Sequence, residues 1–316
     1  MKKFLIAFLF TALLAFPSCD YDYSVNKSDA FYYFTDSVGR EVVLKEKPQK
    51  VAVLFSSYAE VWQISGGTVD ITVGDSIERG FACEDVVLVD EGSGHTTVNL
   101  ELLIAEQPDF VIGTADYDCQ YEACEFVSKH GIPSAVFRVD TFGDYLDMLK
   151  ICCDINENPY GYTEYGDNVK NNIENMLALL KNETKSPKIL FMRAGSSARS
   201  TKAKNSRDNF ACAMLNELGA VNIADSAPVL LDGLSMEEII NKPPEYIFIS
   251  PMGDETASRQ YVESLLQTPV WQSLDCVKNG KYYFLPKDLF HYKPNHKWDT
   301  AYKYLIKILY PEIKID

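Results

Sequence analysis

The chain has 316 residues, of which 47% are hydrophobic and 24% are charged, so it is long enough to form two compact lobes. Acidic residues outnumber basic ones by 45 to 30, which gives a net charge of −15. The chain therefore has no positive surplus to neutralise phosphates, and this argues against nucleic acid as a partner. An anionic small ligand needs only a local group of Arg or Lys and is not excluded.

The first 19 residues have the pattern of an export signal. Lys2 and Lys3 precede an apolar stretch over residues 4–14, which is shorter than a transmembrane helix requires. Ser18 followed by Cys19 resembles a bacterial lipoprotein cleavage site. We expect residues 1–19 to be a lipoprotein signal peptide, with Cys19 as the lipidated residue and residues 20–30 as a tether. Simple secretion is the alternative.

Strands and helices alternate over residues 31–141, which predicts a first lobe built around a parallel sheet. The lobe opens with an expected β-hairpin over 31–44, which turns at Asp36 and Gly39. The elements expected after it are, in chain order, strand 51–55, helix 56–63, strand 71–74, strand 110–113, helix 121–129 and strand 135–139.

The pattern changes over residues 142–186. Apolar residues recur there at helical spacing, and a stretch with Asn, Pro and Gly at 156–161 interrupts them. We interpret this segment as one long connecting helix, bent or broken at that stretch, without a strand partner.

Residues 187–316 repeat the order of the first lobe. The expected elements are strand 188–192, helix 209–218, strand 246–250, helix 258–267, strand 281–285 and an amphipathic closing helix 298–309. The sequence thus predicts an α/β fold of two similar lobes with central, mainly parallel sheets. A long connecting α-helix joins the lobes, and a ligand cleft lies between them.

One run occurs in both lobes without a gap, over 99–112 and over 235–248. In each copy a capping residue, Asn99 or Ser235, precedes a two-turn helix, proline ends the helix, and an apolar strand follows. Ser235 also has capping-box spacing to a glutamate three residues on. Each copy carries a glutamate in the first turn, Glu101 and Glu237, where the helix dipole favours a carboxylate. Either glutamate alone would only stabilise a helix start, whereas the shared register predicts one unit used twice with an acidic tip on each.

Seven cysteines follow Cys19, and their number is odd. They form no paired CxxC motifs, which argues against a zinc knuckle or an iron–sulfur site. Cys119 and Cys124 are candidates for a bridge in an exported protein. Cys152 and Cys153, adjacent on a helix, are expected to be small buried apolar residues.

Several of these runs together resemble a known family. The opening Phe34 to Val42, the two glutamate runs, Gly131-Ile132-Pro133 and the run 277–281 are similar to those of the helix-linked, class III periplasmic binding proteins. These deliver ferric siderophores, haem or cobalamin to ABC importers. The resemblance implies an exported monomer, lipid-anchored at the outer face of the bacterial cytoplasmic membrane. Its partners would be an ABC permease with its ATPase, docked through Glu101 and Glu237.

Ligand contacts are expected in the loops at the carboxyl ends of the strands, where open α/β sheets place their sites. The candidates in these loops are Tyr58, His95, Tyr117, Arg193, Arg199, Met252, His291 and Tyr292. Several have an ordinary structural alternative: Tyr58 and Met252 as packing residues, Arg199 as part of a solvated charge run, His291 as a donor to a backbone carbonyl. His130 and His296 are excluded as helix-end and surface residues.

We expect the ligand to be an iron complex, bound as cargo with no intrinsic cofactor. A ferric siderophore would use Arg193 and Arg199 against an anionic chelate, with His291 as an iron contact. Haem would need an axial ligand such as Met252 or His291 in an apolar slot. Cobalamin would need aromatic walls, but the three tryptophans fall mostly on expected helices.

Three other functions remain as alternatives. A subunit that binds Zn²⁺ or Mn²⁺ directly needs several converging histidines, and the chain has only four, which are scattered. A secreted enzyme would be expected to show a nucleophile elbow, a P-loop or an H-E-x-x-H motif, and none is present, so no catalytic residue is assigned and no enzyme is expected. A surface adhesin could use the same fold without transport.

Overall fold

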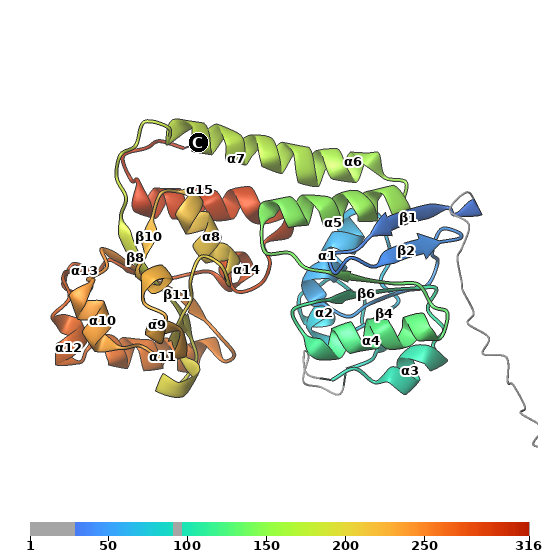
Figure 1. Ribbon diagram of the computed structural model, residues 1–316, viewed down its shortest axis with the longest axis horizontal. Helices are drawn as coiled ribbons and strands as arrows, with labels where there is room; N and C mark the ends of the chain where they lie inside the picture. The colour runs from blue at the N-terminus through green and yellow to red at the C-terminus, as the bar shows by residue number, and fades with distance from the viewer. Residues whose placement is uncertain (1–28, 91–96, 316) are drawn as a thin grey trace, which may run out of the picture.

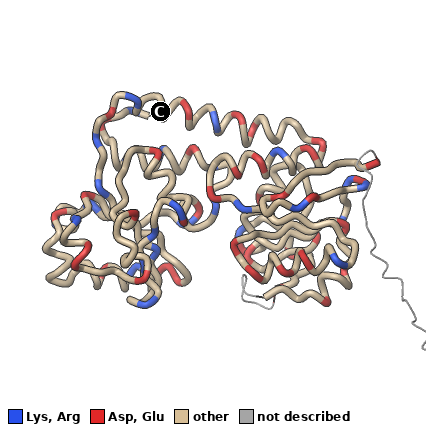
Figure 2. Tube along the Cα trace, in the orientation of Figure 1, with Lys and Arg blue, Asp and Glu red and all other residues tan. Residues whose placement is uncertain are grey.

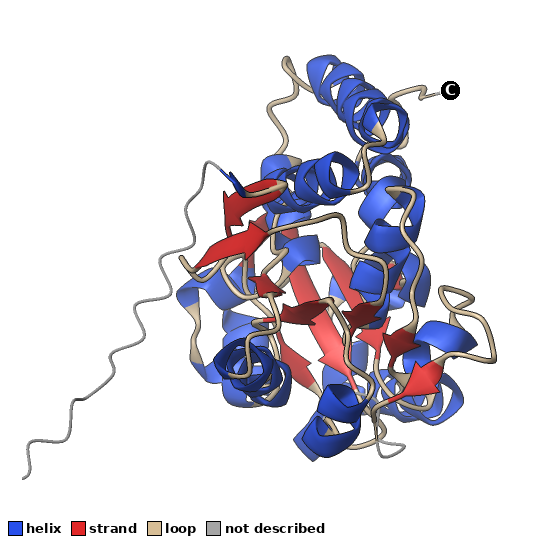
Figure 3. Ribbon diagram, turned by 90° about the vertical axis from the view of Figure 1, so that its right-hand side faces the viewer, coloured by secondary structure: helices blue, strands red, loops and turns tan. Residues whose placement is uncertain are grey.

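A computed structural model describes residues 29–90 and 97–315 of the chain. Two α/β lobes lie next to each other, and a layer of long helices crosses both of them (Figure 1). Each lobe holds one mainly parallel sheet with helices on both sides (Figure 3). The predicted two-lobed α/β architecture is confirmed. Within the described residues, no helix has the length and apolar character needed to cross a bilayer.

The N-terminal lobe has a five-stranded sheet of order β5-β4-β3-β6-β7, in which all pairs are parallel. Helices return the chain between the strands, as parallel pairing requires. The strands are β3 (Val51–Val53), β4 (Ile71–Thr72), β5 (Val87–Leu88), β6 (Phe110–Thr114) and β7 (Ser134–Phe137). The helices are α1 (Ser56–Ile64), α2 (Gly74–Glu78), α3 (Leu100–Ala105) and α4 (Asp118–Lys129).

The predicted hairpin is present as β1 (Tyr32–Thr35) and β2 (Glu41–Leu44). Asp36, 5% exposed, organises its turn. The carboxylate accepts the backbone N–H of Val38 and forms a 2.8 Å ion pair with Arg40. It also accepts the N–H of Val136 in β7 at 3.0 Å. One buried side chain therefore shapes the turn and attaches the hairpin to the sheet.

The C-terminal lobe repeats this sheet with the order β10-β8-β11-β12, and β9 pairs with β8 in the antiparallel sense. The central strands β8 and β11 correspond to β3 and β6, so the predicted duplication is confirmed. Its strands are β8 (Lys188–Ala194), β9 (Lys202–Ala203), β10 (Val221–Asn222), β11 (Tyr246–Pro251) and β12 (Tyr282–Phe284). Its helices are α8 (Phe210–Glu217), α9 (Val229–Asp232), α10 (Met236–Asn241), α11 (Glu255–Leu266), α12 (Pro269–Gln272), α13 (Asp275–Lys278) and α14 (Lys287–Phe290), with short 3₁₀ turns at Ala198–Ser200 (η3) and Ile223–Ser226 (η4).

The connector is not one continuous helix. α5 (Phe142–Ile155) packs on α1, and the chain then reverses at residues 156–158, where Glu157 has a φ of 56°. α6 (Pro159–Tyr162), the π-helical turn η2 (Thr163–Asp167) and α7 (Asn168–Leu179) run back as one stretch above both lobes (Figure 1). α7 packs on the closing helix α15 (Trp298–Leu309).

Asn158 explains the reversal. Its side chain caps α6 by accepting the N–H of Gly161, and its amide donates to the carbonyl of Ser65 at the end of α1. Pro159, the first residue of α6, favours a new helix start. The sequence therefore locates the break correctly, but the prediction of a single helix missed the change of direction.

The two copies of the glutamate run fold into α3 followed by β6 and α10 followed by β11. Asn99 caps α3 by accepting the N–H of Leu102 at 2.9 Å. Ser235 makes no such bond, so the expected capping box is wrong. Glu101 and Glu237 are both exposed in the first turn of their helices, as their register predicts.

The seven cysteines after the signal segment are free thiols, so the candidate bridge between Cys119 and Cys124 is not formed. Cys152 and Cys153 are buried, as expected. Burial raises the pKa of the Cys153 thiol to about 11 and that of Cys124 to about 12.

The lobes meet at the chain between α14 and α15, which includes η5 (Asn295–Lys297). Asn295 is fully buried, and its amide donates at 2.7 Å both to the carbonyl of Ser57 and to the Glu60 carboxylate on α1. Nδ1 of His296 lies 3.0 Å from the other oxygen of Glu60. His296 is thus half-buried at the contact between the lobes, and its assignment as a surface residue is corrected.

Replacing Asn295 by Gly removes both hydrogen bonds but suits the φ of 50° at this position. We expect the free energy of unfolding to fall by about 2 to 4 kcal/mol, because Glu60 then keeps its buried charge with one partner fewer. Urea unfolding measures this, with Asn175→Ala on the exposed face of α7 as the control. Equal midpoints for the two variants would show that Asn295 does not hold the lobes together.

Candidate functional site

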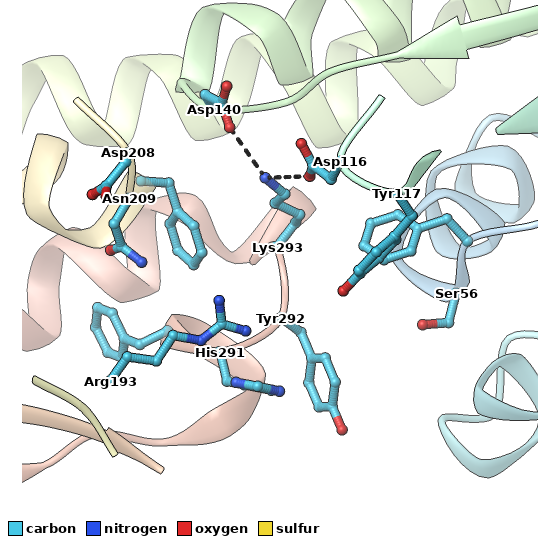
Figure 4. Close-up of a pocket in the computed structure, with 13 residues that line it drawn as sticks. Ser56, Asp116, Tyr117, Asp140, Arg193, Asp208, Asn209, His291, Tyr292 and Lys293 are labelled. Atoms are coloured by element: carbon cyan, nitrogen blue, oxygen red, sulfur yellow. Dashed lines mark hydrogen bonds and ion pairs between the residues drawn. The ribbon is translucent and has the colours of Figure 1, made fainter. Parts of the chain in front are cut away.

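A cavity of about 220 Å³ lies between the lobes (Figure 4). Both lobes line it, and polar side chains outnumber apolar ones. The N-terminal lobe contributes Phe55, Ser56, Asp116, Tyr117 and Asp140, and the rest of the wall is Arg193, Asp208, Asn209, Phe210, Phe290, His291, Tyr292 and Lys293.

The sheets account for this position. Ser56 follows β3, Tyr117 follows β6 and Asp140 follows β7, while Arg193 lies at the carboxyl end of β8. Parallel strands end at the same edge of a sheet, so the carboxyl edges of the two sheets converge on the cavity. The expected cleft position between the lobes agrees with the structure.

Arg193 is the cation that dominates one wall. It is half-buried, and among the described residues no carboxylate lies within ion-pair distance of it. Tyr117 lines the opposite wall, where burial raises the pKa of its phenol and the charge of Arg193 opposes that rise. The cavity therefore offers a positive charge and a neutral phenol to an incoming ligand.

Lys293 is the other cation of the cavity, and it is already neutralised. Its Nζ lies 3.2 Å from Asp116 and 3.4 Å from Asp140, both carboxylates of the N-terminal lobe (Figure 4). Its side chain is only 11% exposed. Lys293 thus joins the lobes and offsets one of the two negative charges of its partners, and Asp208 adds a third carboxylate to the wall.

His291 and Tyr292 form a third part of the wall, on the chain that leaves α14. Their rings meet edge to face with centroids 4.9 Å apart. The Tyr292 ring also lies under the guanidinium of Arg79 at 4.0 Å. Burial raises the pKa of Tyr292, and the Arg79 charge acts in the opposite direction.

The structure brings together four of the eight ligand-contact candidates: Tyr117, Arg193, His291 and Tyr292. Tyr58 is a correction, because it is fully buried in the N-terminal core, with its hydroxyl 3.3 Å from both Thr114 and the carbonyl of Phe137. Arg199 is exposed on η3, and Met252 does not line the cavity. His95 and the lipidation candidate Cys19 lie outside the described residues.

Sequence reasoning missed part of the wall. Asp208 and Asn209 come from the start of α8, and Lys293 follows the predicted pair His291-Tyr292. A cap position after a strand is a usable signal for Asn209, whose side chain caps α8. No local pattern marks Lys293, because its two carboxylate partners are distant in the sequence.

Two further observations concern the distribution of charged residues and the groups that could bind a metal ion. Acidic and basic positions are interspersed over both lobes in Figure 2. Over residues 29–90 and 97–315, no three His, Cys, Asp or Glu side chains are grouped so that they could hold a metal ion.

Comparisons with known proteins agree with this architecture. The model of the periplasmic binding protein family matches residues 51–289. No curated protein sequence matches the chain. The chain is similar in structure to the periplasmic haem-binding protein RhuT from Roseiflexus sp. RS-1 (TM-score 0.67, 16% identity, covering 83% of this chain and 98% of that one).

Two other similar structures are those of proteins described with different ligands. One is Staphylococcus aureus SirA complexed with staphyloferrin B (TM-score 0.64, 18% identity, covering 88% of this chain and 98% of that one). The other is the periplasmic vitamin B12 binding protein BtuF of Vibrio cholerae (TM-score 0.67, 15% identity, covering 83% and 97%). At these identities the likeness establishes the shared fold.

Replacing Lys293 by Met leaves Asp116 and Asp140 without their shared cation. We expect the free energy of unfolding to fall by about 1 to 3 kcal/mol, because a largely buried ion-pair partner is lost. Adding Asp116→Asn and Asp140→Asn should recover part of this loss, and thermal unfolding of the variants measures it. Lys297→Met is the matched control, since Lys297 pairs with Asp288 at 3.6 Å with both side chains exposed. A triple variant less stable than Lys293→Met would contradict the charge interpretation.

Proposed function

Because the chain belongs to the periplasmic binding protein family, we propose that it captures an anionic ferric chelate between its lobes and delivers it to an ABC importer. The observation that carries the choice of ligand is Arg193, a half-buried guanidinium on the cavity wall with no carboxylate partner among the described residues. A charged chelate would supply the missing counter-charge through charge-assisted hydrogen bonds. His291 and Tyr117 are the nearby groups suited to contact iron or its ligand oxygens.

The wall composition favours a siderophore over haem and cobalamin. Haem needs an apolar slot with an axial ligand; His291 lines the cavity and could be that ligand, but Met252 is absent and the wall is mainly polar. The three tryptophans, Trp62, Trp271 and Trp298, are all buried in the core, so none offers the aromatic wall that cobalamin would use. The protein acts as a binding protein and not as an enzyme, as the family's role in solute binding supports.

Transport requires a second contact, with the membrane permease. Glu101 and Glu237 are exposed at the starts of equivalent helices, one on each lobe. Two carboxylates on separate lobes suit a two-part docking surface on a permease, with its ATPase on the other side of the membrane. Export and anchoring through a lipid on Cys19 would keep a monomer of the protein at the outer face of the cytoplasmic membrane.

The proposed ligand can be tested directly. We expect the protein purified from its native host to show the charge-transfer band of a ferric chelate, whereas a Soret band would indicate haem and cobalamin bands would indicate the vitamin. Arg193→Ala should lower the affinity for ferric citrate about 10- to 100-fold, the size expected for a charge-assisted hydrogen bond. Tryptophan fluorescence can follow the titration, because the Trp298 ring packs against the ring of the cavity residue Phe210, with 5.7 Å between the ring centroids.

Arg199→Ala is the matched control for that titration, since Arg199 is exposed on η3 away from the cavity. Equal affinities of the Arg193 and Arg199 variants for ferric citrate would refute the role given to Arg193. A Soret band or cobalamin bands would refute the choice of a siderophore.

The docking role predicts a separation of binding from transport. Each exposed ion pair contributes on the order of 1 kcal/mol, so we expect Glu101→Ala and Glu237→Ala together to cripple uptake of labelled ferric chelate by cells. Affinity of the purified variant for the chelate should be unchanged. Glu174→Ala on α7, in the helical layer over the lobes, is the control. Normal uptake by the double variant would rule this role out.

A further inference from the structure

Arg79, at the C-terminal end of α2, touches both walls of the cavity without being part of its lining. Its Nη1 donates to the hydroxyl oxygens of Ser56 and Ser57 at 2.9 Å each. The guanidinium carbon lies 4.0 Å from the centre of the Tyr292 ring and 4.7 Å from that of Phe81. Ser56 belongs to the N-terminal lobe and Tyr292 to the chain that leaves α14, so one side chain supports cavity residues from both sides.

No carboxylate of the described residues forms an ion pair with Arg79. Within the part of the chain that the structure describes, no Asp or Glu lies within 4.0 Å of its guanidinium. It borders a second cavity of about 270 Å³, whose two acidic residues are already engaged. Glu60 binds Asn295 and His296, and Asp288 pairs with Lys297.

This arrangement is unexpected in a chain with 45 acidic and 30 basic residues. Burial lowers the pKa of Arg79, because desolvation of its charge outweighs the attraction of the more distant carboxylates Glu60, Asp75 and Asp288. A half-buried guanidinium that keeps several N–H donors free of carboxylates is costly for the folded protein. A ligand that carries negative charge would remove this cost.

The hydrogen bonds indicate how the charge acts on the cavity. Ser56 accepts from Arg79 through Oγ, so its own hydroxyl hydrogen is available to another acceptor. Among the described residues no acceptor for that hydrogen is found, and Ser56 lines the cavity (Figure 4). An oxygen of a bound ligand at this wall would therefore meet a hydroxyl donor with a positive charge directly behind it.

We propose that Arg79 is a positioning and specificity-determining residue, which with Arg193 makes the cavity select a ligand with at least two anionic groups. Arg79 orients the Ser56 hydroxyl as a donor, holds the Tyr292 ring in place and supplies the second positive charge. Lys293 does not serve as this second charge, because Asp116 and Asp140 already pair with it. The inference rests on the proposed function and specifies the class of chelate, a polyanionic one.

The test compares two iron chelates of opposite charge, ferric citrate and the cationic complex ferrioxamine B. We expect Arg79→Gln to lower the affinity for ferric citrate at least about 10-fold, as for the loss of interactions with a charged group. Its effect on ferrioxamine B should stay within about twofold. The dependence of ferric citrate binding on salt concentration should also weaken, because one attractive charge is removed. Arg79→Lys, which keeps the charge, should keep this salt dependence.

Two serine variants separate positioning from general stability. Ser56→Ala removes the cavity hydroxyl and should weaken binding of ferric citrate several-fold. Ser57→Ala removes an equal hydrogen bond to Arg79. Both serines are almost fully buried, but Ser57 does not line the cavity, so binding should weaken less than in Ser56→Ala. Thermal unfolding of each variant checks that it remains folded at the assay temperature.

The outcomes distinguish this inference from the proposed function. Wild-type protein that binds ferric citrate while Arg79→Gln binds it equally well refutes the role of Arg79 alone. Equal losses for ferric citrate and ferrioxamine B also refute it, because a purely structural residue would act without regard to ligand charge. Wild-type protein that binds neither chelate refutes the proposed function and this inference together.

Discussion

The buried carboxylate of Glu60 is the group on which the arrangement of the two lobes depends. It lies on α1 of the N-terminal lobe and is 5% exposed, so it must find its partners inside the protein. Both partners that bind it, Asn295 and His296, belong to the chain between α14 and α15. Because an unpaired buried charge is costly, this contact fixes how that chain passes the N-terminal lobe.

The same two segments, α1 and the chain between α14 and α15, also form walls of the cavity. Ser56 begins α1 one turn before Glu60, while His291, Tyr292 and Lys293 precede Asn295 on the crossing chain. Walls contributed by different lobes are therefore held in register by bonds just outside the cavity.

Charged side chains of both signs line the cavity. Two of its carboxylates, Asp116 and Asp140, share the single cation Lys293, which offsets one of their two negative charges. Arg193 and, behind the wall, Arg79 keep charges that no carboxylate of the described residues neutralises. The wall holds two cations, Arg193 and Lys293, against three carboxylates, Asp116, Asp140 and Asp208, so the positive charge is local to Arg193.

The sequence by itself determined the duplicated α/β lobes, the succession of strands and helices that they share along the chain, the cleft between them and the exposed glutamates at equivalent helix starts. These follow from hydrophobic periodicity, helix caps and a repeated run, all of which are local in the chain. It also identified four residues that line the cavity, Arg193, Tyr117, His291 and Tyr292, because the segments at the carboxyl ends of parallel strands share one edge of a sheet. Only the tertiary structure decided that Tyr58 is a core residue, that the connector reverses at residue 156, and that Lys293 and Arg79 shape the cavity. Each of these depends on partners far apart in sequence, such as Lys293 with Asp116, and no local pattern records which distant segments folding brings into contact.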